Sequence, residues 1–305
     1  MTAEPDGATV PEVAVVVPHH GDPAPTLETV RALLAQRDVA LEVVVADDAS
    51  PEPFPDVPGA VVVRRERNGG FGAAVGTGVE AVTAPLLLVL NSDVSFGPTF
   101  VADLLAAAAP WQPAVVGPLV LDADGTPAPT ARHFPRVSHQ AVEWLTPLAR
   151  FRGRRTLREA VGHDTRAVAG AVLPVDWVVG AAMLLPTDAF RAVGGFDERY
   201  FMNSEEVDLQ RRLREAGVPS VFAGTVSLTH IGGGSSDPGL RRRWLVESRM
   251  AYAGRWGGRR RLAAALTAAT AVNAVANTGR RLAGRDVAPV ATAREELRLI
   301  HGGCR

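Results

Sequence analysis

Short runs of valine and leucine alternate with segments of helical spacing over the first third of the chain. Apolar runs of strand length occupy residues 13–17, 41–46, 60–63 and 86–90. Segments with helical spacing or small residues lie between them at residues 26–36 and 71–82. Because strands that alternate with helices pair in parallel, this pattern predicts an α/β fold with a Rossmann-like, mostly parallel central sheet and flanking helices.

The same reasoning extends the sheet along the chain. We predict a helix at residues 100–109, a strand at 115–121, a return to the sheet at 175–185, a short helix at 187–193 and strands at 218–222 and 226–229. Residues 122–170 are rich in Arg and Pro, and we expect an irregular excursion there. The 305 residues divide into a tail at 1–12, an α/β domain at 13–238 and a basic helical extension at 239–305.

Polar side chains directly follow two of the predicted strands. Asp47 and Asp48 end the second strand, and Asn91, Ser92 and Asp93 end the fourth. Parallel sheets bind ligands beyond these carboxyl ends, where a carboxylate can accept hydrogen bonds from a nucleotide or hold a hard divalent cation. The alternative is that these residues only form turns, for which Asp and Asn are well suited.

Two glycine-rich loops are candidates for contact with phosphate. His230 precedes a loop of three glycines and two serines, and we expect it to share a cation with Asp93; the alternative is a histidine that merely ends a strand. Residues 68–72 read Asn-Gly-Gly-Phe-Gly, which is neither a dinucleotide fingerprint nor a lysine-containing Walker loop. The backbone of this loop can still pass close to a ligand.

A dense acidic segment follows the Gly-Gly-Phe-Asp-Glu turn at residues 194–198. Glu205 and Glu206 open a predicted helix, and Asp208 lies just inside it. A carboxylate held against apolar walls keeps a raised pKa and can act as a general base. The alternative is that these acids only interact favourably with the N-terminal end of the helix dipole.

Charge is unevenly divided along the chain. The net charge is −1, yet residues 241–305 carry 14 Arg and 4 acidic residues, which leaves −11 for residues 1–240. A basic extension favours an anionic partner, a membrane surface or nucleic acid, or else packing on the acidic body. The apolar stretch at residues 262–276 is shorter than the about 20 residues that span a bilayer, so we expect surface contact at most. No nucleic-acid recognition motif is evident, and we expect no nucleic-acid partner.

The single cysteine and the N-terminal residues indicate the cellular compartment that we expect for the protein. Cys304 is the single cysteine, which rules out a disulfide framework and favours a reducing environment. Residues 1–12 hold three acidic residues and no apolar core, so we predict a flexible tail rather than a secretory signal. We therefore expect a cytoplasmic protein, with contact at the inner face of the plasma membrane through the basic extension.

The motifs, taken in order, resemble the family-two inverting glycosyltransferases of GT-A fold, in particular their rhamnosyltransferase-like branch. The resemblance runs from about residue 13 to residue 236. It rests on VVVPHH (15–20), VVVADDAS (43–50), RNGGFGAAVGTG (67–78), LLLVLNSD (86–93), GPLVLDADG (117–125), VDWVVGAAMLL (175–185), GGFDERYFMNSEEVDLQRRL (194–213) and HIGGGSS (230–236). Each motif is weak by itself, and their common order carries the resemblance.

The resemblance implies roles for particular residues. It places Mg²⁺ or Mn²⁺ on Asp93 and His230 and the general base at Glu206, with Glu205 as an alternative base. The nucleotide-sugar donor would contact Pro18, Asp47, Asp48, Asn68, Gly72, Asn91, Ser92 and Asp93. The sugar and acceptor side would comprise Trp177, Gly180, Ala181 and Asp208. Three departures stand out: Asn91 at the first position of the DxD motif, Glu at the base position and Gly76 in place of an asparagine.

The implied activity is metal-dependent inverting sugar transfer, from dTDP-L-rhamnose or else from a UDP-hexose or UDP-galactofuranose. The implied acceptor is a polyprenyl-linked sugar or a polysaccharide in envelope synthesis, reached by the excursion at residues 122–170. One rival is a catalytically silent module that binds sugar nucleotides. Another is nucleotidyl transfer to a sugar phosphate, which requires a basic glycine-rich N-terminal signature that residues 15–23 lack.

Overall fold

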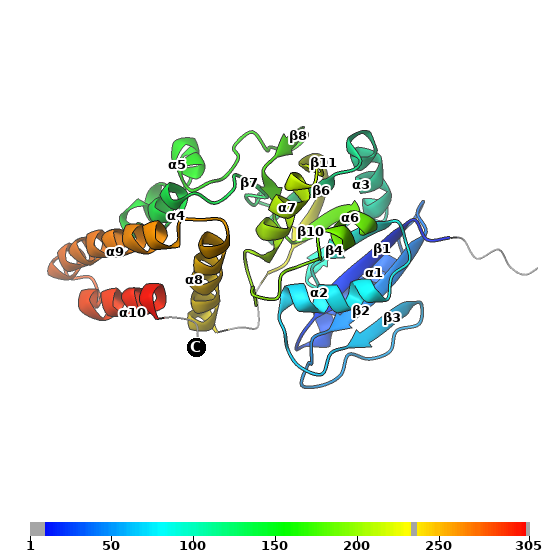
Figure 1. Cartoon of the computed structure of the whole chain (residues 1–305), viewed down its shortest axis with the longest axis horizontal. Coiled ribbons are helices and arrows are strands. Elements are labelled where there is room, and N and C mark those ends of the chain that lie inside the picture. Colours follow the sequence, from blue (N-terminus) through cyan, green and yellow to red (C-terminus); the bar gives the residue numbers. More distant parts are fainter. Residues whose placement is uncertain (1–9, 233–236, 303–305) are drawn as a thin grey trace, which may run out of the picture.

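The computed structural model describes residues 10–232 and 237–302 (Figure 1). A central sheet fills one half of the molecule, and the C-terminal helices lie at the opposite end. Within the described chain the sheet has 9 strands in the order β3-β2-β1-β4-β10-β6-β11-β5, with β8 paired to β11. The predicted α/β class with flanking helices is confirmed.

The first strands form the parallel part of the sheet. They are β1 (Val13–His19), β2 (Leu41–Asp47), β3 (Ala60–Arg64) and β4 (Leu86–Leu90). β1 lies in the middle, with Val15 opposite both Val43 and Leu88. Its odd-numbered residues pack with α1 (Pro23–Leu34) and α3 (Phe100–Ala108), and its even-numbered residues pack with α2 (Phe71–Glu80). Burial of both faces explains why these strands are continuous apolar runs.

The second half of the sheet is mixed rather than mostly parallel. β10 (Ala182–Pro186) runs antiparallel between β4 and β6 (Val115–Leu121). β11 (Ser220–His230) is one strand with a register break between Ala223 and Ser227, where we predicted two strands. It runs parallel to β6 but antiparallel to β5 (Val94–Ser95) and β8 (Val172–Val175). This pairing brings the end of β11 beside the residues that follow β4.

The prediction that residues 122–170 are irregular is wrong. They form β7 (Ala131–Arg132), α4 (Val137–Trp144), the 3₁₀ helix η2 (Thr146–Phe151) and α5 (Arg155–Ala160). These helices are too short for a hydrophobic period to be visible in the sequence. β7 pairs with β9 (Trp177–Val178) in a separate two-stranded sheet, so residues 175–185 return to the main sheet only in part.

Shorter helices complete the core. They are η1 (Ala109–Trp111), α6 (Thr187–Ala192) and α7 (Glu205–Glu215), the last of which carries the acidic segment. Leu209 and Leu213 of α7 pack in the same buried cluster as α2 and the even-numbered residues of β1. α7 therefore lies on the α2 face of the sheet, with its N-terminus directed toward the strand ends (Figure 1).

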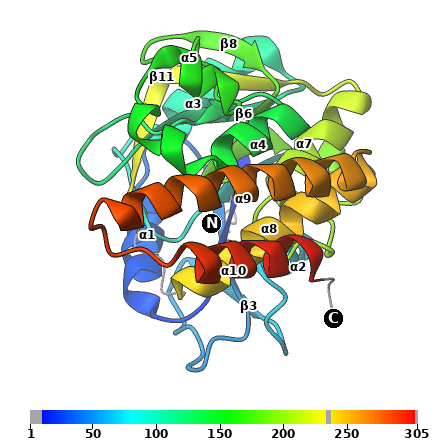
Figure 2. The ribbon, with the colours of Figure 1, turned by 90° about the vertical axis from the view of Figure 1, so that its left-hand side faces the viewer.

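The C-terminal extension is a layer of helices. α8 (Pro238–Arg255), α9 (Arg259–Leu282) and α10 (Pro289–His301) pack together, and α9 and α10 lie side by side (Figure 2). α9 is bonded to the excursion: Trp144 Nε1 donates to Thr270, and Asn273 bonds both the carbonyl of Trp144 and the amide of Thr146. Among the helices of residues 10–232 and 237–302, none has the length and apolar character needed to cross a bilayer.

Some expectations concern residues that the structure does not describe. They are residues 1–9 of the predicted tail, residues 233–236 of the glycine-serine loop, and Cys304.

Candidate functional site

Side chains from two distant motifs meet where β4 and β11 end. His230 Nε2 lies 3.0 Å from Asp93 Oδ1 and 3.2 Å from Asn91 Nδ2. The backbone amide of Ile231 donates to the carbonyl of Asp93 at 2.9 Å, which fixes the two segments together. The hydrogen bond to Asp93 raises the pKa of His230, while burial acts in the opposite direction. The side chains of His230 and Asp93 are 32% and 30% exposed, so a ligand can reach both.

The donor atoms at this point fit a divalent cation. Adjacent ligands of an octahedral ion with bonds of about 2.1 Å lie about 3.0 Å apart, and Asp93 Oδ1 and His230 Nε2 are separated by 3.0 Å. A single carboxylate and a single imidazole leave coordination positions for phosphate oxygens and water. The turn itself is fixed by Thr29, whose hydroxyl donates to the carbonyls of Ser92 and Val94. Asp93 and His230 are therefore candidate cation ligands, and this site stays a prediction.

The two aspartates after β2 are committed to protein groups. Asp47 has 0% exposure and accepts hydrogen bonds from the amides of Ser50 and Phe54 and from Arg64. Burial acts to raise the pKa of Asp47, but these hydrogen bonds outweigh it and lower the pKa to about 2. The predicted contact of Asp47 with a nucleotide is therefore wrong, since its carboxylate has no exposed surface.

Asp48 holds the glycine loop of residues 68–72 through hydrogen bonds. Its carboxylate accepts hydrogen bonds from the amides of Gly69 and Gly70 and pairs with Arg65 at 2.9 Å. Beside it, Asn68 Nδ2 lies 3.2 Å from His20 Nε2, close to the end of β1 that contains Pro18. The donor contacts of Asp48, Asn68 and Pro18 stay predictions.

The glycine loop supports the acidic segment. Gly70 has φ +86°, and a side chain there would overlap the carbonyl oxygen of Phe201. A Cβ on Gly72 would lie 2.8 Å from Cβ of Phe196 and 3.8 Å from Cβ of Glu205. Gly72 thus faces the segment that carries the acids, and this close packing takes the place of the donor contact that we predicted for it.

A strained turn sets the direction of the two glutamates. Asn203 and Ser204 both have left-handed backbone conformations, with φ of 70° and 69°, immediately before α7. Such strain costs about 1–3 kcal/mol per residue and concentrates at functional sites. Glu205 is only 5% exposed and packs inward beside Gly72, whereas Glu206 lines an open pocket. The structure thereby separates two residues that the sequence left equivalent.

The glutamates are electrostatically unusual. Burial raises the pKa of Glu205 well above 4.5, and the charge of Glu206 raises it further. Burial likewise raises the pKa of Glu206, although the positive charge of Arg132 opposes this. The Oε2 atoms of both glutamates are buried and have no hydrogen-bond partner in the described chain. A buried carboxylate of raised pKa that faces a pocket is suited to receive a proton.

The turn between β9 and β10 connects the glutamate to the cation site. The amide of Asn91 donates to the carbonyl of Ala181 at 2.9 Å. A Cβ on the adjacent Gly180 would lie 3.6 Å from Cβ of Glu206. A chain of neighbouring residues therefore runs from His230 and Asn91 through this turn to Glu206.

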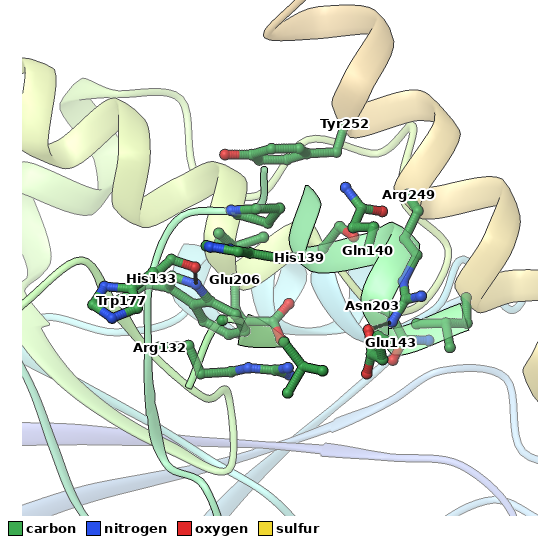
Figure 3. A pocket seen from close by; sticks show the side chains of 16 residues that line it. Arg132, His133, His139, Gln140, Glu143, Trp177, Asn203, Glu206, Arg249 and Tyr252 are labelled. Carbon is green, nitrogen blue, oxygen red and sulfur yellow. Dashed lines mark hydrogen bonds and ion pairs between the residues drawn. The ribbon is translucent and has the colours of Figure 1, made fainter. Parts of the chain in front are cut away.

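The pocket beside Glu206 has a volume of ≈ 100 Å³ and opens to solvent (Figure 3). Trp177, predicted for the acceptor side, lines it. Its other walls come from the excursion, where we expected acceptor contacts, and from the strained turn and α8, which the sequence did not assign to the acceptor site; the principal side chains are Arg132, His133, His139, Glu143, Asn203, Arg249 and Tyr252. The one available signal for them was the concentration of Arg and His in residues 131–139.

Asp208 is not on the acceptor side as predicted. It has 0% exposure and accepts hydrogen bonds from Trp256 Nε1 at 2.8 Å and Tyr200 at 3.3 Å. It also pairs with Arg212 at 2.9 Å and Arg255 at 3.2 Å. Because Arg255 and Trp256 belong to the end of α8, Asp208 holds the C-terminal extension against α7.

A second group of potential ligands lies behind the pocket. His133, Glu159 and Asp164 bring ligand atoms within 4.8 Å of one another. Arg166 already holds both oxygens of Asp164, at 2.9 and 2.6 Å, and Thr165 donates twice to Glu159. These oxygens are occupied by protein donors, which makes the group a structural network.

Known proteins are similar to this chain over most of its length. The model of the family "Glycosyl transferase family 2" matches residues 14–173. The N-acetylglucosaminyl-diphospho-decaprenol L-rhamnosyltransferase of Mycobacterium tuberculosis is 32% identical over 239 residues, covering 72% of this chain and 75% of that protein. The validoxylamine A glucosyltransferase of Streptomyces hygroscopicus is 30% identical over 70% of this chain and 54% of that protein.

Solved structures share the fold. The mannosyltransferase PcManGT of Pyrobaculum calidifontis, in complex with GDP-Man and Mn²⁺, aligns with a TM-score of 0.57 and 17% identity. The alignment covers 97% of this chain and 87% of that chain. At this identity the likeness concerns the fold, including the mixed sheet and its helical covering.

Proposed function

The chain belongs to glycosyl transferase family 2, and from that membership we propose that it moves L-rhamnose from dTDP-rhamnose to a polyprenyl-linked acceptor, with inversion at the sugar. The 32% identical relative from Mycobacterium tuberculosis is named as an L-rhamnosyltransferase that acts on N-acetylglucosaminyl-diphospho-decaprenol, which supports the transferred sugar and the acceptor class. A role in envelope polysaccharide synthesis at the inner face of the plasma membrane follows from such an acceptor.

One observation carries the proposal. The cation pair of Asp93 and His230 and the pocket-facing Glu206 are joined through the single turn at Gly180 and Ala181. A donor diphosphate bound at the pair and an acceptor in the pocket would meet at this turn. Under this proposal, three residues that are far apart in the sequence border a common reaction site.

The chain's own residues supply proton transfer and alignment. Glu206 takes the proton of the acceptor hydroxyl as its oxygen attacks C1 of the sugar, and the bond from C1 to the nucleoside diphosphate breaks on the opposite face. General-base assistance of this kind contributes about 10²–10⁴-fold in rate. Asp93 and His230, with the Asn91 amide beside them, would hold Mg²⁺ or Mn²⁺, which neutralises charge on the departing diphosphate.

Other donors and a silent module are the alternatives. Because the validoxylamine A glucosyltransferase is also similar to this chain, a UDP-hexose is an alternative donor. UDP-galactofuranose is a further candidate. Calorimetric titration of purified protein with dTDP-rhamnose and with UDP-sugars, in Mg²⁺ or Mn²⁺, selects among the donors. Release of nucleoside diphosphate from the bound donor distinguishes an enzyme from a silent module, and binding without any release would contradict the proposal.

The C-terminal extension supports contact with an anionic membrane. The face of α9 opposite its packed side is exposed and apolar, with Val272 52%, Val275 75% and Leu282 85% exposed. Arginines lie at both ends of the helix, at Arg259–Arg261 and at Arg280 and Arg281, and are exposed. An apolar face flanked by cations is suited to the boundary between headgroups and acyl chains.

The aromatic residues near the start of the extension do not belong to this surface. The aromatic residues of α8 and its end face the protein: Tyr252 is 3% exposed, Trp244 packs on Phe201 and Trp256 bonds Asp208. Removal of the whole extension would also remove a wall of the pocket. The sharper test is the paired substitution Val275→Glu and Leu282→Glu, which should abolish co-sedimentation with anionic vesicles while transfer to a water-soluble acceptor persists. Unchanged vesicle binding would contradict the membrane role of α9.

A further inference from the structure

Arg132 lies in the wall of the pocket, on the same side as Glu206 (Figure 3). Its backbone is held on both sides: β7 pairs Arg132 with Trp177 of β9, and a further bridge joins it to His163. The guanidinium group lies 5.5 Å from the centroid of the Trp177 ring. The side chain is thus placed by rigid backbone and by stacking, and this leaves its N–H donors to be accounted for.

Those donors have no partner within the described chain. The other cations of the pocket are matched, since Arg249 pairs with Glu143 and His133 lies 3.0 Å from Glu159. No hydrogen bond or ion pair of the Arg132 side chain occurs among residues 10–232 and 237–302, although Glu143 and Glu206 both act on its charge. Arg132 is therefore a pocket cation that has carboxylates nearby but no hydrogen-bond partner in the described chain.

A guanidinium without a hydrogen-bond partner is available to a ligand. The Arg132 side chain is half-buried and lines the pocket, so its N–H donors can be reached from there. Desolvation lowers the pKa of Arg132, while the charges of Glu143 and Glu206 act to raise it, and arginine stays protonated in proteins. The planar guanidinium matches the oxygens of phosphate in a two-bond arrangement.

We propose that Arg132 binds a phosphate group of the acceptor and thereby holds the acceptor sugar with its hydroxyl at Glu206. This inference rests on the proposed function, because it identifies Arg132 as the residue that recognises the diphosphate of a lipid-linked sugar. The glutamate and the arginine line the same pocket, one suited to a hydroxyl and the other to an oxyanion. The pocket would thus distinguish phosphorylated acceptors from neutral glycosides.

The acceptor accounts for the position of Arg132 better than the donor does. The donor diphosphate is assigned to Asp93 and His230, whose contacts are with Asn91 and the end of β11. The charges that act on Arg132 are those of Glu143, Arg249 and Glu206, all of which line the pocket. We therefore assign Arg132 to the acceptor pocket and not to the cation pair.

The first test compares two acceptors with the full-length enzyme. Arg132→Gln should lower kcat/KM by about 10- to 100-fold with a short-chain prenyl-diphosphate N-acetylglucosamine, the loss expected for a charge-assisted hydrogen bond. With a neutral alkyl N-acetylglucosaminide, kcat/KM should change by less than about 3-fold, and the donor KM should stay the same. Arg136→Gln, an exposed arginine outside the pocket, is the matched control and should behave as wild type.

Each contrary result overturns the assignment. Equal losses with both acceptors would mean that Arg132 acts through Glu206 or through the fold, and a raised donor KM would place it on the donor diphosphate. Arg132→Lys adds a further check, since it keeps the charge but loses the two-bond geometry and should restore only part of the activity.

The second test does not depend on sugar transfer. Inorganic diphosphate titrated into metal-free protein in the presence of a chelator should bind wild type and Arg136→Gln, and should bind Arg132→Gln at least about 10-fold more weakly. Equal binding by all three proteins would overturn the anion site. Arg132-dependent binding in a protein that transfers no sugar would refute the proposed function and leave the anion site standing, so the two failures are distinguishable.

Thermal unfolding tests whether the substitution of Arg132 destabilises the fold. Because the half-buried Arg132 side chain has no hydrogen-bond partner in the described chain, Arg132→Gln should unfold at the same temperature as wild type or at a higher one. A lower unfolding temperature would assign Arg132 a structural role and count against the proposal.

Discussion

The two sides of the site differ in how completely the protein satisfies its own polar groups. On the strand-end side, Asp47 and Asp48 hold backbone amides and arginines, and Asp93 already bonds His230. On the pocket side, buried atoms of Glu206, His139 and Gln140 have no hydrogen-bond partner within the described residues. Burying polar groups without partners costs free energy that a bound ligand can recover. The strand-end side is thus preformed, whereas the pocket is built to be completed by a ligand.

Substitution of the pocket carboxylate should have the largest effect. Glu206→Gln keeps the shape of the side chain but cannot accept the proton, so we expect a loss of at least about 100-fold in kcat. Donor affinity, measured by calorimetry, should be retained because the donor diphosphate is assigned to the strand-end side. Glu205→Gln is the matched control one residue away and should keep most of the activity. The reverse order of the two variants would move the base to Glu205.

Loss of the cation pair of Asp93 and His230, on the strand-end side of the site, should have the next largest effect. Asp93→Ala removes the carboxylate that bonds His230, and we expect transfer to fall by about 100-fold while the dependence on added Mg²⁺ or Mn²⁺ weakens. Steady-state rates across a metal titration measure this. A wild-type enzyme that keeps its full rate in excess chelator would show that the pair holds no metal.

Asp208 tests the attachment of the extension that walls the pocket. Asp208→Ala leaves Arg212, Arg255 and Trp256 without their shared acceptor, and breaking such a buried network typically costs about 3–5 kcal/mol. Urea denaturation would measure the loss of unfolding free energy. Among molecules that stay folded, we expect the acceptor KM to rise more than the donor KM. Wild-type stability would show that α8 is held by its apolar contacts alone.

Glu205 provides the smallest effect, which depends on pH. Its pKa is raised above 4.5 by burial, so the folded state keeps a proton that the unfolded state has released. Its contribution to stability is therefore present below about pH 4.5 and is lost as the pH rises through the raised pKa. Glu205→Gln removes this titration and should gain stability relative to wild type between about pH 5 and about pH 8. A constant difference in unfolding temperature across that range would contradict the raised pKa.

The sequence alone determined the strand-end half of the site. The strands at residues 41–46 and 86–90 are continuous apolar runs, and the polar residues that follow them must lie at one edge of a parallel sheet. His230 could be added because a strand precedes it. Antiparallel β10 and the helices of the excursion were missed, since a short buried strand carries no sign of its direction and short helices show no period.

Only the tertiary structure decided which side chains face the pocket. Neighbouring residues of a helix point about 100° apart, so the strained turn at Asn203 and Ser204 determines that Glu206 and not Glu205 lines the open space. Arg132 entered the site through its pairing with Trp177, and Asp208 left it because α8 folds back over α7. Local composition fixes where a strand ends, but the direction of a side chain depends on contacts between segments that are far apart in the chain.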